Sequence, residues 1–167
     1  MKPHTFPSLS FLATIFLAGI LFQTSCSSGK QVTTSKEEIL QAISGDNWMF
    51  TAQHANPQYG RSRNVNGVYE VKCTKDKLEV YLPYFGRSYS GGGAYTNQNP
   101  LDFKSSVFSL NKEEDKKGNR VVTIKPNDYN EVQSMVFTFY NTGNALLDVQ
   151  LTNRSAISFT GIIAPLK

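Results

Sequence analysis

Two spacings of hydrophobic residues follow each other along this chain. Ile39, Leu40 and Ile43 fall on one helical stripe, and Gly45 lies just beyond it. Residues 35–38, Ser-Lys-Glu-Glu, have the form of a capping box, which is typical of a helix start. Because a single amphipathic stripe usually faces the protein's own core, we expect a short helix that packs on a sheet.

From Asn47 onward, apolar and polar residues alternate, which is the period of half-buried strands. The alternating apolar groups are Trp48/Phe50/Ala52, Tyr69/Val71/Cys73, Leu78/Val80/Leu82, Phe108/Leu110, Val122/Ile124, Met135/Phe137/Phe139, Leu147/Val149/Leu151 and Ile157/Phe159. Polar turns at 74–77, 112–119 and 141–144 indicate hairpins, and no βαβ pattern is present. We therefore expect an all-β fold of about eight strands with one short N-terminal helix. An antiparallel sandwich and a partly closed barrel fit this alternation equally well.

The first residues of the chain resemble an export signal. Lys2 gives a basic start, and an apolar run extends from Phe11 to Phe22, shorter than the ~20 residues of a membrane-spanning helix. Small residues then precede Cys26. We predict a signal peptide over 1–25, a lipid-anchored flexible tether over 26–34 with the lipid on Cys26, and a single β-rich domain over 35–167. The alternative is ordinary secretion, with Cys26 left as a thiol.

Charge and residue counts exclude several kinds of partner. The net charge is +4, and the three lysines of the run 112–117 are balanced by three acids, so nucleic acid is a poor candidate partner. His4 belongs to the predicted signal, which leaves His54 as the only histidine, and Cys73 is the only cysteine besides Cys26. We therefore expect no structural zinc, no other metal, no cofactor and, if Cys26 is acylated, no intrachain disulfide.

The segment 82–95 interrupts the alternation. Pro83 should end its strand, three consecutive glycines follow at 91–93, and the segment nevertheless carries four aromatic residues and an arginine. The candidate ligand-binding residues are Tyr84, Phe85, Arg87, Tyr89 and Tyr95. The rings would supply stacking area, and Arg87 would pair with a carboxylate or phosphate. The alternative is that Tyr84 and Phe85 pack into the core and the loop has no chemical role.

No catalytic constellation is visible in the sequence, so we predict no catalytic residue and no enzyme. His54 has no Gly-x-Ser-x-Gly elbow to serve, and Cys73 alternates with core residues. The acids of 113–115 sit in a charged turn where nothing would raise the pKa of one of them. The segment 82–95 also lacks the Gly-Lys-Ser/Thr ending of a phosphate loop, which argues against nucleotide binding.

Residues 82–87, Leu-Pro-Tyr-Phe-Gly-Arg, follow a Lys/Asp turn and resemble the signature of the domain-of-unknown-function family 4251. The resemblance extends over about Ser35 to Ile163. It implies an exported protein of a Bacteroides-type Gram-negative bacterium, often with a lipoprotein signal, in a family without an established activity. No acidic run follows Cys26, so the resemblance also implies an outer-membrane anchor that faces the periplasm.

Together these observations predict a non-enzymatic β-domain in the cell envelope, attached to the membrane through lipid on Cys26. We expect it to bind a small apolar ligand, a glycan or an envelope protein through the loop between Tyr84 and Tyr95. The alternative is a structural or inhibitory envelope protein that acts only by protein contact through a sheet face.

Overall fold

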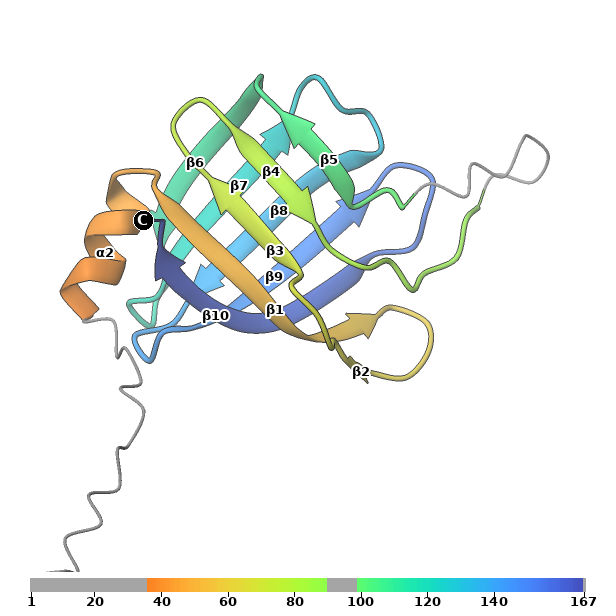
Figure 1. Ribbon diagram of the computed structural model, residues 1–167, viewed down its shortest axis with the longest axis horizontal. Helices are drawn as coiled ribbons and strands as arrows, with labels where there is room; N and C mark the ends of the chain where they lie inside the picture. Colours follow the sequence, from red (N-terminus) through yellow and green to blue (C-terminus); the bar gives the residue numbers. More distant parts are fainter. Residues whose placement is uncertain (1–35, 90–98, 167) are drawn as a thin grey trace, which may run out of the picture. The chain divides into compact units, whose positions relative to one another are not determined.

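The structure, a computed structural model, describes residues 36–89 and 99–166 (Figure 1). In this part of the chain one helix, α2 (Lys36–Ser44), precedes ten strands. The strands are β1 (Trp48–Pro57), β2 (Arg63–Asn64), β3 (Glu70–Cys73), β4 (Leu78–Tyr81), β5 (Asp102–Ser105), β6 (Phe108–Glu114), β7 (Arg120–Pro126), β8 (Val132–Phe139), β9 (Asn144–Leu151) and β10 (Ile157–Pro165). The predicted all-β class with one short helix is confirmed. The short strands β2 and β5 account for the difference from the predicted number of about eight.

All strands belong to one antiparallel sheet that curls into a nearly closed barrel (Figure 1). The strand order is β5-β4-β3-β1-β10-β9-β8-β7-β6, and β2 pairs beside β1. The two end strands of this path, β5 and β6, are consecutive in sequence and joined only by residues 106 and 107. The ends of the sheet therefore meet at this connection, and of the two architectures that fit the sequence the structure has the barrel.

The seam between β5 and β6 is closed at one end by the β7–β8 loop. The carboxylate of Asp128 accepts hydrogen bonds from the backbone N–H groups of Ser106 at 2.9 Å and Val107 at 3.1 Å. The ring of Tyr129 stacks on Phe103 with centroids 4.1 Å apart. These contacts hold the short β5–β6 connection against the loop.

At its other end, β6 is joined by Lys112 to the turn between α2 and β1. Its Nζ lies 2.7 Å from the carboxylate of Asp46 and donates to the carbonyl of Ser44 at 2.8 Å. Lys112 lies opposite the buried Val122, on the inner face of its strand. An inward-facing charge on an edge strand also discourages pairing with another chain.

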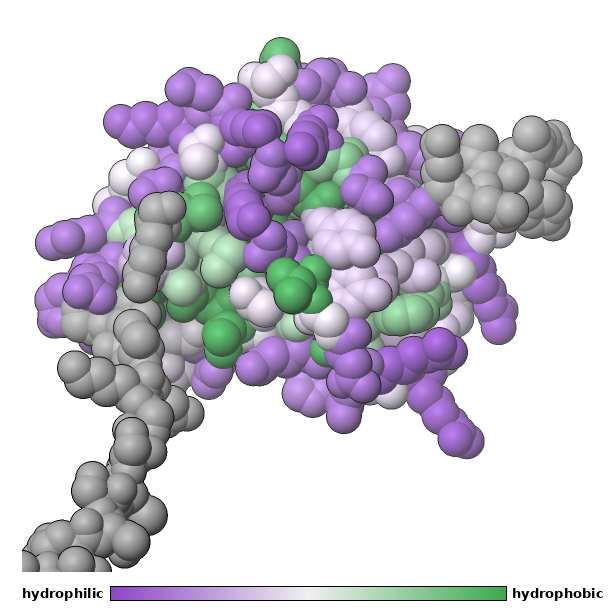
Figure 2. Space-filling view, viewed as in Figure 1, coloured by the Kyte–Doolittle hydropathy of each residue, from purple (hydrophilic) through white to green (hydrophobic). Residues whose placement is uncertain are grey.

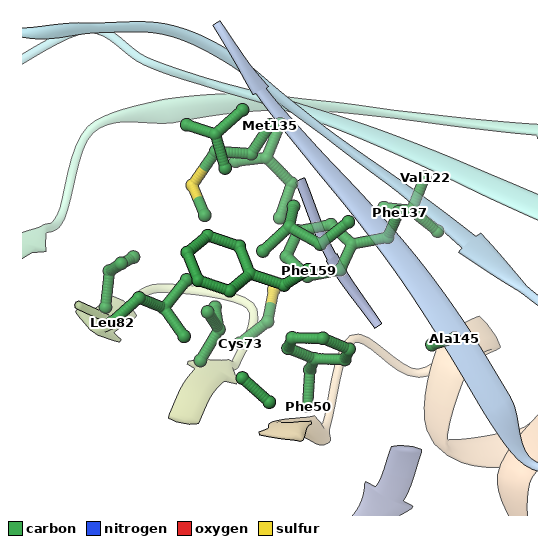
Figure 3. Close-up of a cluster of buried hydrophobic side chains, with 14 of the residues drawn as sticks. Phe50, Cys73, Leu82, Val122, Met135, Phe137, Ala145 and Phe159 are labelled. Atoms are coloured by element: carbon green, nitrogen blue, oxygen red, sulfur yellow. The ribbon is translucent and has the colours of Figure 1, made fainter. Parts of the chain in front are cut away.

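Aliphatic and aromatic side chains together fill the inner face of the sheet (Figure 3). The ring of Trp48 meets Phe137 at 4.9 Å and Phe139 at 5.1 Å in edge-to-face contacts, and Phe50 meets Phe137 at 5.8 Å. Such pairs contribute about 0.5–1.5 kcal/mol beyond their buried area. Gly161 permits β1 and β10 to approach, because an added Cβ would lie 2.0 Å from the carbonyl oxygen of Thr51.

The helix α2 packs against β1 and β10 at the end of the barrel where β1 begins. Its buried residues are Ala42 and Ile43. Ile43 belongs to the predicted apolar stripe, whereas Ile39 and Leu40 of that stripe are half-buried and Ala42 is not part of it. The helix ends where the N–H of Gly45 donates to the carbonyl of Gln41 at 2.9 Å. Ser35, the predicted cap, lies outside the described residues.

Candidate binding site

The predicted binding segment is an excursion from the β4–β5 hairpin. At its base, the N–H of Leu82 donates to the carbonyl of Leu101 at 2.8 Å. The side-chain amide of Asn99 donates to the carbonyl of Leu82 at 2.6 Å, and its oxygen accepts from the N–H of Leu101 at 3.1 Å. The excursion therefore starts from a fixed point, and residues 83–89 of it belong to the described part of the chain.

Tyr84 anchors the excursion to the β9–β10 turn. Its hydroxyl donates to the carbonyl of Ser155 at 2.8 Å and lies 3.1 Å from the Ser155 hydroxyl. The Ser155 hydroxyl also accepts a hydrogen bond from the N–H of Arg87 at 2.9 Å. The N–H of Ser155 in turn donates to the carbonyl of Arg87 at 2.9 Å. Burial raises the pKa of Tyr84, and the hydrogen bond with Ser155 opposes that rise. With Ser155 only 1% exposed, these bonds are shielded from water.

Gly86 makes this arrangement possible. A Cβ on Gly86 would lie 1.9 Å from the Tyr84 hydroxyl oxygen and 2.5 Å from the Ser155 hydroxyl oxygen. Only a glycine leaves room for the Tyr84 ring to fold back over the backbone. We call Tyr84, Gly86 and Ser155 the tyrosine latch. It gives the Leu-Pro-Tyr-Phe-Gly-Arg motif a structural role.

Beyond the latch, the excursion lies along the β9–β10 turn. Ser88 forms a β-bridge with Arg154, and the N–H of Tyr89 donates to the carbonyl of Asn153 at 2.9 Å. We call residues 83–89 the strap, because they extend from the end of β4 to this turn. The strap end of the barrel is thus the end away from α2, where Pro57 of β1 pairs with Ile157 of β10.

Three arginines stack on aromatic rings along the strap. The guanidinium carbon of Arg63 lies 4.9 Å from the ring centroid of Phe85, that of Arg87 lies 5.3 Å from Tyr59, and that of Arg154 lies 5.6 Å from Tyr84. The exposed rings beside them are Tyr59 at 47% and Tyr89 at 59%. The arginine–aromatic surface comprises Tyr59, Arg63, Tyr84, Phe85, Arg87, Tyr89 and Arg154. Figure 2 shows hydrophilic side chains projecting at this end of the domain, next to paler ones.

Two of these arginines have no acidic partner in the described residues. Arg154 lies 3.5 Å from the carboxylate of Glu131, whereas no carboxylate pairs with Arg63 or Arg87 in ranges 36–89 and 99–166. The neighbouring stretch 90–98 contains no Asp or Glu in its sequence. A guanidinium that stacks on a ring keeps its N–H donors at its edge, where they match a carboxylate or phosphate.

The predicted site residues separate into two groups. Tyr84 serves the latch, while Phe85, Arg87 and Tyr89 belong to the strap's outer contacts. Tyr95 and Cys26 lie outside the described residues. Sequence reasoning missed Tyr59, Arg63, Arg154 and Ser155, which come from a turn, the two-residue strand β2 and the β9–β10 turn. No local pattern marks them, because only the fold brings them to the strap.

Cys73 and His54, the two residues considered above as catalytic candidates, lie far apart. Cys73 is fully buried opposite Trp48, whereas His54 is exposed and lies six residues further along β1, about 20 Å at the usual rise of a strand. Burial raises the pKa of the Cys73 thiol to about 12, and the charge of Asp46 adds to this rise. The described residues contain no group of three or more His, Cys, Asp or Glu side chains that could hold a metal ion.

Comparison with known proteins points to one family. A family model described as "Domain of unknown function (DUF4251)" matches residues 30–163. The chain is also similar to the crystal structure of a DUF4251 family protein from Bacteroides eggerthii DSM 20697, with a TM-score of 0.55 and 14% identity over 78% of this chain and 87% of that chain. That likeness concerns the fold. No curated protein matches the chain. Among the described residues, no helix is long and apolar enough to span a membrane.

Proposed function

The chain belongs to the DUF4251 family, whose description assigns no function, and we propose that its domain is a non-enzymatic binding module for an acidic segment of a partner protein. The observation that carries the proposal is the pair Arg63 and Arg87. Each is stacked on a ring, and neither has a carboxylate partner in the described ranges.

The stacked arginines are well suited to binding carboxylates. A side chain that is already held loses less conformational entropy when a ligand binds, so more of the interaction free energy appears as affinity. A hydrogen bond to a charged group contributes about 1.5–3 kcal/mol, and a guanidinium can make two of them to one carboxylate. The net charge of the sequence, +4 with Lys2 of the predicted signal included, is positive and adds long-range attraction for an acidic partner.

The composition of the surface favours a protein over the other two expected ligand classes. Tyrosine and arginine dominate the residues that carry the free energy of protein–protein binding, and both are exposed here at Tyr59, Tyr89, Arg63 and Arg87. A small apolar ligand is disfavoured on this surface because guanidinium groups lie on it. The inside of the barrel is not available to such a ligand either, because the side chains of the core fill the inner face of the sheet. A glycan is the alternative that the experiment must exclude.

The test is photo-crosslinking in the producing cell, with a benzophenone amino acid in place of Tyr89. We expect a protein adduct that disappears in the Arg63→Gln/Arg87→Gln double variant. The matched control is Arg120→Gln, because Arg120 pairs with Glu114 at the other end of the barrel, and this variant should keep the adduct.

Three outcomes would contradict the proposal. The first is an adduct of equal intensity in the double variant. The second is an adduct with carbohydrate only, and the third is a protein adduct obtained from a probe at Ile162 but not at Tyr89. Ile162 is 42% exposed on the outer face of β10, so the third outcome would favour a structural or inhibitory protein that acts through a sheet face.

Purified full-length protein should also bind poly-L-glutamate, more weakly as salt concentration rises.

For the location, we propose a lipoprotein of the outer membrane that faces the periplasm. The support is the signal-like pattern of residues 1–25 before Cys26. Mass spectrometry of the protein extracted from its own membrane should find lipid on the N-terminal Cys26, and Cys26→Ser should release the protein from the membrane fraction. An unlipidated native chain would contradict the anchor without affecting the proposed binding surface.

A further inference from the structure

Asp148 has an unusual position in the sheet. It lies in the middle of β9 on the outer face, between Val136 of β8 and Ser158 of β10, and it is half-buried. Aspartate is depleted in strand interiors, and a partly buried carboxylate normally has a partner. No described residue makes an ion pair or hydrogen bond with the Asp148 side chain, and burial alone raises its pKa. Its remaining hydrogen bonds are therefore open to solvent or to a ligand.

Asp148 lines a hollow on the outer face of three neighbouring strands. The hollow has a volume of about 170 Å³ and is lined by Asn56, Gln58, Asp148, Val149, Gln150, Ala156, Ile157 and Ser158. The register places Asn56 of β1 next to Ser158 of β10, and Ser158 next to Asp148. A carboxylate, a hydroxyl and three amides thus line the hollow, from β1, β9, β10 and the residue after β1, and no lysine or arginine is among them.

The chemistry of this lining identifies its ligand. Amide and hydroxyl groups both donate and accept hydrogen bonds, as sugar hydroxyls do, whereas a cation would require acceptors only. A carboxylate without a basic partner accepts strongly from hydroxyl groups. Gln58 is already fixed, because its side-chain oxygen accepts the N–H of Ala156 at 3.2 Å. The volume is below the roughly 300–1,000 Å³ of pockets for drug-sized ligands, which suits a single ring.

We infer that this hollow binds one neutral sugar residue, with Asp148 accepting from adjacent ring hydroxyls and Asn56, Gln150 and Ser158 completing the contacts. The site is separate from the arginine–aromatic surface and does not depend on the function proposed there. It adjoins that surface, because Gln58 of the hollow precedes Tyr59 in the chain.

The experiment is a titration of the full-length protein with glucose, galactose, mannose and N-acetylglucosamine, followed in ¹H–¹⁵N NMR spectra. We expect at least one of these sugars at millimolar concentration to shift the amide signals of 148–150 and 156–158. Asp148→Asn should weaken that binding about tenfold or more, because an amide cannot replace a carboxylate as a double acceptor. Asp102→Asn, which changes an exposed acid on β5, is the matched control and should bind as the parent does.

A stability measurement separates a binding role from a structural one. Asp148→Asn removes a half-buried charge without a partner, so its midpoint of urea unfolding should equal or exceed that of the parent. If this variant does not fold, Asn56→Ala supplies the second test and should lose the same binding. The inference is overturned if none of the four sugars shifts these signals, if Asp148→Asn binds as well as the parent, or if calcium chloride produces the shifts instead.

Discussion

The two ends of the barrel are closed in different ways. At the end where β1 begins, α2 buries Ala42 and Ile43, and one ion pair joins Lys112 to Asp46. At the other end, a strap without helix or strand is held by the hydrogen bonds of the tyrosine latch. At the helix end, buried apolar side chains close the barrel. At the strap end, the latch fixes the backbone of the strap, and arginine and tyrosine side chains are left at the surface. This difference is the reason why we propose the strap end, and not the helix end, as the binding surface.

The largest difference in stability between the two ends should appear when one glycine at each end is replaced by alanine. In Gly86→Ala the new Cβ would overlap the Tyr84 hydroxyl, so the latch must break, and we expect a loss of about 3 kcal/mol in the free energy of unfolding. In Gly45→Ala the nearest atom is the carbonyl oxygen of Gln41 at 3.2 Å, and the loss should be below about 1 kcal/mol. Urea unfolding of both variants measures this. Equal losses would show that the latch does not hold the strap.

The latch itself can be examined through its hydroxyl groups. Ser155→Ala removes the hydroxyl that accepts the N–H of Arg87 and that lies 3.1 Å from the Tyr84 hydroxyl, whereas the bond from Tyr84 to the backbone carbonyl of residue 155 remains. We expect a loss of about 2 kcal/mol. Tyr84→Phe removes only one hydroxyl and should cost about 1 kcal/mol. Because the two hydroxyls lie 3.1 Å apart, the double variant should cost less than the sum of the single variants. Additive losses would mean that the pair does not act as a unit.

At the helix end, Lys112→Met should have a smaller effect. The ion pair with Asp46 is partly exposed, with side chains 33% and 23% accessible, so we expect a loss of about 1 kcal/mol or less in unfolding experiments. The crosslink from position 89 should persist in this variant, because the strap is at the other end. Its disappearance would contradict the division of roles between the two ends.

Sequence reasoning predicted the helix end better than the strap end, for a physical reason. The helix after Ser35 and the alternation from Trp48 onward depend on local periodicity, and the structure has both. Of the predicted stripe, Ile43 is buried, and Ile39 and Leu40 are half-buried. The latch depends on Ser155, which is 71 residues from Tyr84 and carries no sequence pattern of its own. The barrel likewise requires β1 to pair with β10 and the end strands β5 and β6 to meet, and alternation cannot specify either. The segment 82–95 with its Arg87 was recognisable in the sequence as an exception to the alternation, but the other two stacking arginines, Arg63 and Arg154, were not.

The smallest expected effect concerns acid pH at the strap end, where the β7–β8 loop holds the seam. Hydrogen bonds from the Ser105 hydroxyl and the Ser106 N–H lower the pKa of Asp128 below its ordinary value of about 3.9. A carboxylate with a lowered pKa stabilises the fold above its unfolded pKa, and this contribution is lost as pH falls through the folded value. Hydrogen-exchange protection of the Ser106 and Val107 amides should therefore decrease below about pH 4. Asp128→Asn should remove that pH dependence. The same profile in parent and variant would mean that Asp128 does not hold the seam, and the strap end would then depend on the latch alone.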